Sequence, residues 1–562
     1  MKKNIFILFF LQHTYLLSDT TVVAFYNEHQ SFGNSGNNRV AIDTIQFPNS
    51  NSDFSEIIMN VSLECPNGGC DPWDRNAQIS VMNLNDWYEI GRYVTPYGIG
   101  CGWSMDVTDY RSFLQGPVIL KSYIDTWVEP GWLVNINFEF ISGIPEHPYV
   151  NIRKVWNYSN LVYGDNTNPV DIPSFSGLIP SDTYNAFLRM NTSGHGQGNT
   201  DNAAEFSFKL HDIYVNQEPA FVHNFWRSDC EDNPCSPQNG SWLYDRAGFC
   251  PGDKVTPQDF NLLEHSTPGD MVQLDYILEE YFNACSPNNP SCVDGITCTD
   301  CDYNYNGHTQ PFYFIESQLI LRTGTPHSNA DATFMIESQD STNGGLNIYL
   351  ENYVPIYGFQ FKLDFENQEN LNVSGFSFSG TTGGRAESSG WTVSINDSGV
   401  VVGLSQFFGS PIDPGEGLLT QISYTNENNS QFSGIINISD LQVSGYFGAT
   451  LTHEIGQPHS FQTGLTIEEN QLIPISHSLL VAYPNPFNPL LQIPFELSQR
   501  DKIDLNIYDV NGRMIKSLLY DKTMDAGTYK MTWNANSNPS GVYFIMINAG
   551  TYNQTRKVIL IK

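Results

Sequence analysis

Hydrophobic and polar residues alternate with a period of two along most of this chain, in short runs separated by Gly, Pro, Asn and Ser. Such runs predict half-buried β-strands joined by turns, because successive side chains of a strand point to opposite faces of its sheet. The clearest runs lie at residues 57–63, 134–140, 206–210, 312–321 and 358–365. The pattern therefore predicts an all-β protein built from sandwiches.

Turn-rich stretches divide these strands into blocks, and 562 residues are too many for a single core. The first apolar run, at residues 5–11, follows Lys2 and Lys3 and is too short to span a membrane, which is typical of a secretory signal peptide. The expected parts are a signal peptide at 1–20, sandwiches at 21–147, 148–326 and 330–461, a linker at 462–477 and a small sandwich at 478–562.

The net charge is −34, from 60 acidic and 26 basic side chains. This balance argues against a nucleic-acid partner, which needs a basic face. We interpret the acidity as a solubility trait of an exported protein. Only 15% of residues are charged, and Asn, Ser, Gly, Thr and aromatic residues are abundant, which fits extracellular β-domains rather than disorder.

One short motif joins a cysteine pair to charged and aromatic residues. Cys65 and Cys70 flank Pro-Asn-Gly-Gly, a sequence that suits a turn locked by a disulfide. Trp73, Asp74 and Arg75 follow at once, so the turn restricts them. A preorganised carboxylate beside a guanidinium and an indole can bind a polar, ring-shaped ligand. Taken alone, the motif could equally be a stapled hairpin with a surface ion pair.

All ten cysteines precede residue 302, and an even number in an exported chain predicts disulfides. Cys101 could pair with Cys235 or with a loop cysteine. Four clustered cysteines could instead hold zinc, but in an oxidising compartment we favour disulfides, and no metal or other cofactor is expected. This cluster consists of Cys285, Cys292, Cys298 and Cys301.

The motif at 65–75 is followed in order by segments 87–97, 105–109, 123–127, 202–206 and 244–252. In this order the segments resemble the bacterial peptide-N-glycosidase F family over about residues 20–325. The resemblance implies two antiparallel jelly-roll sandwiches side by side, with the active site between them. It implies hydrolysis of the amide that joins an N-glycan to asparagine, N-glycosylated proteins or glycopeptides as substrates, and a Cys230–Cys250 disulfide.

Amide hydrolysis needs a base to activate water, stabilisation of the oxyanion and a proton for the departing nitrogen. Carboxyl groups can move these protons if their surroundings separate their pKa values. Their places in the family motifs imply Asp74 as the acid that acts at the glycosyl-amide nitrogen and Glu205 as the residue that positions or activates water. Asp125 stands where the family has a glutamate important for activity, and is shorter by about 1.5 Å.

The resemblance also implies residues that bind the substrate. Arg75 and Arg246 are expected to bind its polar groups or to keep the acids ionised; for Arg246 the alternative is a structural ion pair with Asp245. Trp127 matches a family tryptophan near the sugar, and Trp73 is a further candidate. For both tryptophans the alternative is packing in the core.

Two departures from the family pattern lie near Glu205. Ala203 and Ser207 replace two cysteines on either side of it, and we expect the strand that carries Glu205 to survive this loss. His195 occupies a loop where characterised members have tryptophan, and we interpret it as an exposed loop histidine.

The third block weakly resembles cohesin-like modules, and we interpret it as a spacer or binding module. The last block contains Pro-Asn-Pro-Phe-Asn-Pro ending at residue 489, Tyr-Asp-Val-Asn-Gly-Arg at 508–513 and Ser-Gly-Val-Tyr-Phe at 540–544. Together these resemble the C-terminal sorting domain of type IX secretion. This implies the type IX machinery as a partner, and a protein that is secreted or attached to the cell surface. We expect it to be a monomer.

Three other functions are weighed against this one. A copper monooxygenase with a similar double sandwich would need a His-x-His motif, which the chain lacks; His211, His223 and His265 are scattered. A second alternative is a non-catalytic glycan-binding surface protein. A third is a glycosidase that cleaves between sugars, since paired carboxylates serve that reaction too.

Overall fold

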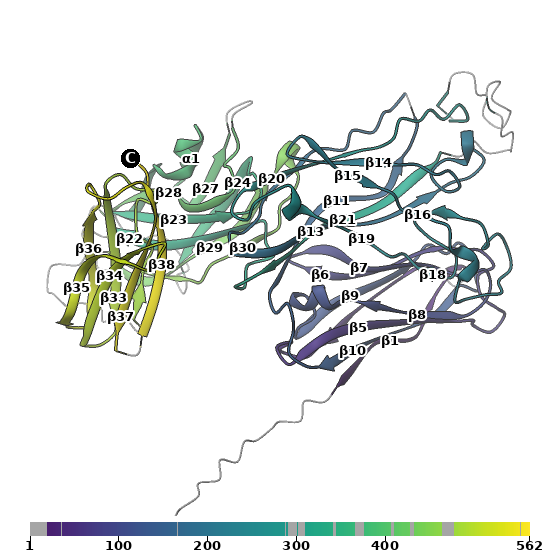
Figure 1. The fold of residues 1–562 in the computed structure, drawn as a ribbon, viewed down its shortest axis with the longest axis horizontal. Helices are drawn as coiled ribbons and strands as arrows, with labels where there is room; N and C mark the ends of the chain where they lie inside the picture. Colours follow the sequence, from purple (N-terminus) through teal and green to yellow (C-terminus); the bar gives the residue numbers. More distant parts are fainter. Residues whose placement is uncertain are drawn as a thin grey trace, which may run out of the picture. The chain divides into compact units, whose positions relative to one another are not determined.

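The computed structural model describes residues 19–34, 36–165, 167–286, 288–289, 301, 310–340, 344–365, 376–405, 410–426, 432–463, 477–550 and 552–562. Strands dominate these ranges, so the predicted all-β class is confirmed (Figure 1). All but two residues of the expected signal peptide lie outside them. The chain divides into two units, 1–464 and 465–562, and each is described by itself. Within the described ranges, no helix has the length and apolarity needed to cross a membrane.

The first sandwich pairs the sheet β1–β10–β5–β8 with the sheet β18–β7–β6–β9–β4. When its eight long strands are counted along the chain, the orders are 1-8-3-6 and 2-7-4-5, the arrangement of a jelly roll. These strands are β1 (Thr20–Gln30), β4 (Val40–Gln46), β5 (Phe54–Glu64), β6 (Asn76–Asn83), β7 (Asp86–Val94), β8 (Cys101–Asp106), β9 (Pro117–Ile124) and β10 (Trp132–Ser142). The short strands β2 (Phe32–Gly33) and β3 (Gly36–Asn37) form a small hairpin beside them.

The second sandwich repeats this topology with the sheets β11–β21–β13–β19 and β12–β20–β14–β15. The expected pair of jelly rolls is therefore present. Its strands are β11 (Val150–Val162), β12 (Phe175–Leu178), β13 (Thr183–His195), β14 (His211–Val215), β15 (Glu218–His223), β19 (Gln258–Asn261), β20 (Met271–Ile277) and β21 (Phe312–Thr323). Three two-residue strands complete it: β16 (Trp226–Arg227), β17 (Arg246–Ala247) and β18 (Asp253–Lys254), which pairs with β7 of the first jelly roll.

The burial pattern shows why these segments form strands in this arrangement. In β10, Trp132, Val134, Ile136, Phe138 and Phe140 are fully buried and alternate with more exposed residues. Burial of each such side chain stabilises the fold by about 1.5–3 kcal/mol. In contrast, β21 is buried on nearly every residue, because one face of its sheet covers its own core and the other lies against the first jelly roll.

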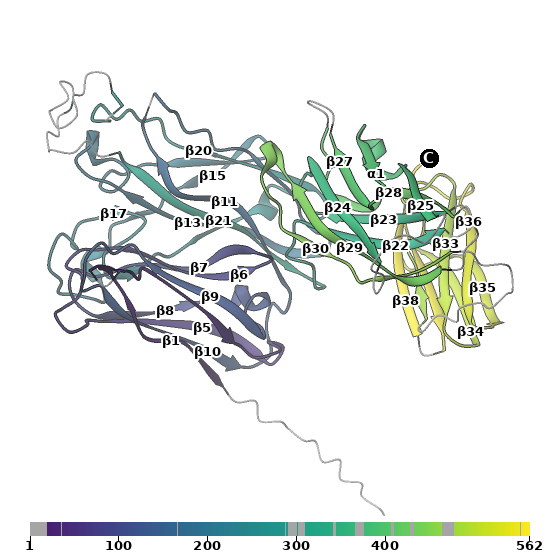
Figure 2. The ribbon, with the colours of Figure 1, turned by 180° about the vertical axis from the view of Figure 1, so that it is seen from behind.

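The third sandwich has the sheets β25–β28–β23–β22–β30 and β26–β27–β24–β29–β31, with β22 and β30 parallel (Figure 2). Its similarity to cohesin-like modules stays a prediction. Its elements are β22 (Ala332–Asp340), β23 (Gly345–Asn352), β24 (Gly358–Phe365), β25 (Phe376–Thr382), α1 (Gly384–Ser388), β26 (Thr392–Ile395), β27 (Val400–Leu404), β28 (Gly415–Asn426), β29 (Phe432–Ser444), β30 (His453–Ile455) and β31 (His459–Thr463).

Arg153 of β11 joins the second jelly roll to the third sandwich. Its side chain is fully buried and donates to the carbonyl oxygens of Ala330 (2.6 Å) and Ser328 (2.9 Å). Its guanidinium carbon lies 3.7 Å from the ring centroid of Tyr353, and Nη1 lies 3.9 Å from Asp331. The third sandwich is thus packed onto the second and is more than a loosely attached spacer.

The second unit contains the sheets β32–β33–β36 and β35–β34–β37–β38 around its own apolar core. A turn at Asn511 and Gly512, where φ is +73° at the glycine, joins β34 to β35. The strands are β32 (Ser478–Leu479), β33 (Leu490–Leu497), β34 (Asp501–Asp509), β35 (Met514–Met524), β36 (Gly527–Asn534), β37 (Gly541–Ala549) and β38 (Tyr552–Leu560). Most of the expected linker, residues 464–476, lies outside the described ranges.

Candidate active site

The loop between β5 and β6 carries Asp74, and a disulfide between Cys65 and Cys70 closes its turn. Asp71, directly after the turn, is fully buried and accepts hydrogen bonds from the backbone N–H of Trp73 (2.9 Å), Arg75 Nε (2.7 Å) and Thr126 Oγ1 (2.7 Å). Asp71 therefore holds both the backbone and the arginine beside Asp74. Sequence reasoning missed this residue, although its place next to Cys70 in the motif could have indicated it.

Glu205 lies in a turn after the short helix η2 (Thr200–Asn202), so the expectation of a strand at this position is wrong. Its carboxylate accepts a hydrogen bond of 3.1 Å from the backbone N–H of Gly196. The turn approaches β13 so closely that a Cβ atom at Gly194 would lie 1.7 Å from the carbonyl oxygen of Ala204. A glycine at 194 is thus what lets the Glu205 turn pack here.

Arg246, on β17, links the two predicted acids. Its side chain is 1% exposed, and Nη1 donates to Glu205 Oε1 and lies 3.5 Å from Asp74 Oδ2. Nη2 is fixed by the carbonyl oxygen and hydroxyl of Ser241, each at 2.8 Å. The alternative ion pair with Asp245 is wrong, because the carboxylates that Arg246 contacts are those of Glu205 and Asp74.

The surroundings change the acidity of both carboxyl groups. Burial raises the pKa of Glu205 to about 7; Arg246 opposes this increase, and the nearby Asp74 adds to it. Burial also raises the pKa of Asp74, while the charge of Arg246 and a hydrogen bond with Tyr97 act in the opposite direction. Two acids that share one guanidinium and have raised pKa values can exchange protons with a substrate.

Tyr97 is a second residue that sequence reasoning overlooked. Its hydroxyl lies 3.1 Å from Ser241 Oγ and accepts a longer contact of 3.4 Å from Arg246 Nη2. Because Tyr97 lies just after β7 of the first jelly roll, this contact ties the first jelly roll to Arg246 of the second. Its place in the 87–97 segment was the available signal.

Asp125 and Trp127 form an outer patch with Arg39. Asp125 accepts hydrogen bonds from Arg39 Nη1 (3.2 Å) and from the hydroxyl of Tyr123 (2.8 Å), so its partners lie outside the Arg246 cluster. The Arg39 guanidinium carbon lies 4.2 Å from the Trp127 ring centroid. Trp127 is 53% exposed and Trp73 is 58% exposed, so the alternative of core packing is wrong for both.

The sequence predicted an exposed loop residue at His195, and this prediction is wrong. His195 is half-buried and is the last residue of β13. Its ring stacks on Phe249 at 4.9 Å and lies 5.2 Å from Phe312. Nε2 lies 2.8 Å from Ser193 Oγ and 3.1 Å from Asn76 Nδ2. Burial lowers its pKa to about 3, so the ring is neutral and supports the strand that leads to Gly196.

The remaining cysteines form disulfides where the structure describes them. The expected Cys230–Cys250 bond is present, Cys101 pairs with Cys235, and Cys285 pairs with Cys301. Cys292 and Cys298 lie outside the described residues. Among those described, no group of three or more His, Cys, Asp or Glu side chains is arranged to hold a metal ion.

Two of the histidines that are scattered in the sequence meet in the fold. His211 on β14 and His223 on β15 are paired in register and fully buried. Nδ1 of His211 accepts from the backbone N–H of Glu279, and Nδ1 of His223 lies 2.8 Å from the hydroxyl of Tyr276. Both rings pack among aromatic side chains of the second jelly roll, apart from the Asp74 loop.

The double jelly roll brings Asp74 of one half and Glu205 of the other to the same arginine, an arrangement suited to the acid–base chemistry of a hydrolase. Residues 163–289 match the family model "Peptide-N-glycosidase F, C terminal", and residues 481–562 match the "Secretion system C-terminal sorting domain". The chain is 32% identical over 322 residues to peptide-N(4)-(N-acetyl-beta-D-glucosaminyl)asparagine amidase F of Elizabethkingia miricola. The aligned region covers 53% of this chain and 82% of that relative. The chain belongs to the peptide-N-glycosidase F family.

Two solved structures of similar proteins are 30% identical to the chain and cover 55% of it. One is a peptide-N(4)-(N-acetyl-beta-D-glucosaminyl)asparagine amidase (TM-score 0.49, 98% of that chain). The other is PNGase F, a glycosylasparaginase from Flavobacterium meningosepticum (TM-score 0.48, 98% of that chain). The C-terminal sorting domain indicates type IX secretion to the cell surface or the extracellular space.

Proposed function

We propose that this chain is a secreted amidase that hydrolyses the bond between an N-glycan and the asparagine of a glycoprotein. The products are a peptide with aspartate at that position and the intact glycan as a glycosylamine. The observation that carries the proposal is the contact of one Arg246 nitrogen with both Glu205 and Asp74. These residues occupy the family's motif positions and bring two acids with raised pKa values to one place.

In this reaction, ionised Glu205 takes a proton from water, and the resulting hydroxide attacks the carbonyl carbon of the asparagine side chain. The C–N bond then breaks, and protonated Asp74 gives its proton to the departing glycosyl-amide nitrogen. Arg246 keeps the two carboxyl groups at a fixed spacing through its contacts with Ser241. The carboxyl groups return to their starting state when a proton passes from Glu205 to Asp74.

Sugar binding is assigned to two exposed tryptophans and to the polar side chains beside them. Trp127 presents an indole that suits the apolar face of a pyranose ring, and Asp125 and Arg39 beside it can bind hydroxyl groups. Trp73 and Arg75 complete the rim on the Cys65–Cys70 side. The reaction as proposed uses no cofactor, and we propose that the protein acts as a monomer.

The test is to incubate the full chain with a denatured N-glycoprotein and to identify both products by mass spectrometry. The proposal predicts aspartate at the former glycosylation site and a released glycan that keeps all its sugars. A glycosidase would leave a sugar on the asparagine. A binding protein would leave the glycoprotein intact, and either result would refute the amidase assignment.

A further inference from the structure

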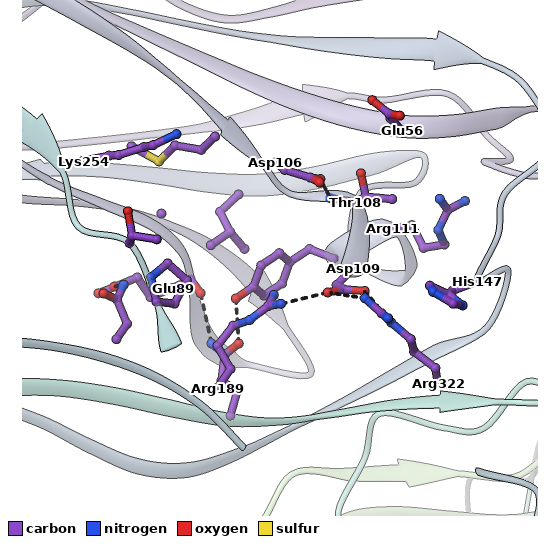
Figure 3. Close-up of a pocket in the computed structure, with 18 of the residues that line it drawn as sticks. Glu56, Glu89, Asp106, Thr108, Asp109, Arg111, His147, Arg189, Lys254 and Arg322 are labelled. Carbon is purple, nitrogen blue, oxygen red and sulfur yellow. Dashed lines mark hydrogen bonds and ion pairs between the residues drawn. The ribbon is translucent and has the colours of Figure 1, made fainter. Parts of the chain in front are cut away.

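A cavity of about 810 Å³ lies at the interface of the two jelly rolls, and Asp74, Glu205 and Arg246 do not line it (Figure 3). Its walls come from β7, β13 and β21, from residues 105–111, which include the start of the short helix η1 (Thr108–Ser112), and from residues 254–257. Glu89 in its wall and Thr95, which binds the backbone of Arg75, are six residues apart along the chain. Six residues of extended strand span roughly 20 Å, so the cavity lies apart from the site formed by Asp74, Glu205 and Arg246.

Two of the cavity's three arginines share one acidic partner, and the third, Arg111, donates to backbone carbonyl oxygens of residues 51, 54 and 55. Arg189 Nη2 lies 2.9 Å from Asp109, and Arg322 reaches the same carboxylate with Nε (3.1 Å) and Nη2 (3.0 Å). Figure 3 shows both side chains directed at Asp109. Because these charges compensate one another and the chain carries a net charge of −34, an acidic ligand is disfavoured.

The inner wall offers hydrogen-bonding groups without a full set of partners. Asn191 is 9% exposed and donates to Glu89, but its Oδ1 has no partner among the described residues. Burial, with Glu89 close by, raises the pKa of Glu316, which favours the protonated form that can itself donate. A buried amide oxygen without a partner costs free energy that a ligand donor would recover.

The remaining walls combine apolar side chains with acceptors at the mouth. Ile90, Met105 and Tyr110 line the cavity, while Glu56, Asp106 and Glu146 are exposed at its edge. A sugar ring has the matching chemistry, because it presents apolar C–H faces and many hydroxyl donors. We propose that this cavity is a second, non-catalytic saccharide-binding site that takes neutral sugar residues, either from a glycan attached to protein or from a free oligosaccharide.

The test measures binding to the full chain carrying Asp74→Asn, so that no substrate is consumed and the result does not depend on turnover. Neutral oligosaccharides of N-acetylglucosamine and mannose are titrated calorimetrically, free and attached to a short peptide, which separates the two sources. We expect two binding events. Thr256→Trp, which adds bulk at an exposed position of the cavity wall, and Asn191→Ala should each weaken the same event at least tenfold.

The matched control is Asn185→Ala, on the same strand β13 but outside the cavity, and it should weaken neither event. If Asn191→Ala fails to fold, Thr256→Trp carries the test alone, since residue 256 is exposed. The absence of any sugar-binding event that Thr256→Trp weakens would overturn the proposal, whereas a single Thr256-dependent event would count only against sugar binding at the Asp74 site. A lysine-rich peptide that binds in a Thr256-dependent manner while neutral sugars do not would also overturn the proposal.

Discussion

Arg246 donates a hydrogen bond from Nη1 to Glu205, 41 residues earlier in the chain, and the same nitrogen lies 3.5 Å from Asp74, 172 residues away. Glu205 and Arg246 belong to the second jelly roll and Asp74 to the first. The carboxyl pair exists only when both sandwiches are folded and packed together, so the interface between them is part of the site.

Glu205→Gln tests the proposed base. Burial raises the pKa of Glu205 to about 7, and the ionised form is the one that can take a proton from water. The kcat/KM of the native protein should therefore increase with pH through about 7. Glu205→Gln should lower it by about 10²–10⁴-fold and should lack this rise. A pH profile of glycopeptide hydrolysis measures the size of kcat/KM and its increase with pH. If kcat/KM of Glu205→Gln still increases through about pH 7, Glu205 is not the base.

The same residue predicts a change of stability with pH. The pKa of Glu205 is higher in the folded protein, at about 7, than its usual 4.5, so ionisation costs more in the folded than in the unfolded state. Its contribution to stability is fully present below about pH 4.5 and is lost as the pH increases to about 7. Urea unfolding across this window should show Glu205→Gln gaining stability relative to the native protein. If the stability of Glu205→Gln relative to the native protein stays constant or decreases as the pH rises, the raised pKa of Glu205 is contradicted.

Removal of the Cys65–Cys70 disulfide should affect both stability and activity. With Cys65→Ser and Cys70→Ser together, the free energy of unfolding should decrease by about 2 kcal/mol, as expected for a short closed loop. Activity should decrease more than global unfolding explains, because Asp71 and Asp74 lose a fixed backbone. Thermal unfolding and kcat at a temperature where the variant is folded separate these effects. Full activity of the folded variant would show that the disulfide does not position Asp74.

Asp125→Glu restores the longer side chain that the family resemblance implies at this position. If Asp125 binds a sugar hydroxyl, the added reach should strengthen one hydrogen bond and lower KM by about fivefold, with little change in kcat. Asp125→Ala is the matched variant and should raise KM. A change confined to kcat in both variants would show that residue 125 acts on the chemical step instead.

Asp331→Ala tests whether the third sandwich stabilises the jelly rolls. Asp331 lies 3.9 Å from the buried Arg153 and accepts two hydrogen bonds from Thr452, at 2.9 and 2.8 Å. The loss of this carboxylate should lower the free energy of unfolding by about 3 kcal/mol. Asp413→Ala, at an exposed position of the same sandwich, is the control. Equal and small effects in both variants would mean that the junction contributes no stability.

The sequence predicted most strands because their side chains alternate, and β10 shows this from Trp132 to Phe140. The run at 206–210 also alternates but forms no strand, so that prediction is wrong. The sequence predicted the Cys65–Cys70 turn because the constraint is local. It missed the role of Asp71, the turn at Glu205 and the stacked position of His195. Each of these depends on contacts between distant segments, such as the approach of Ala204 to Gly194 or of Phe249 to His195, which alternation does not encode.

The most direct test of the account compares Asp74→Asn with Asp245→Asn in the full chain on a denatured N-glycoprotein. Both variants remove one negative charge, but Asp245 is exposed and is not among the carboxylates that contact Arg246. The account predicts that Asp74→Asn lowers glycan release by about 10²–10⁴-fold or more, whereas Asp245→Asn keeps it within a factor of about two. Equal release by the two variants would contradict the central role of Asp74.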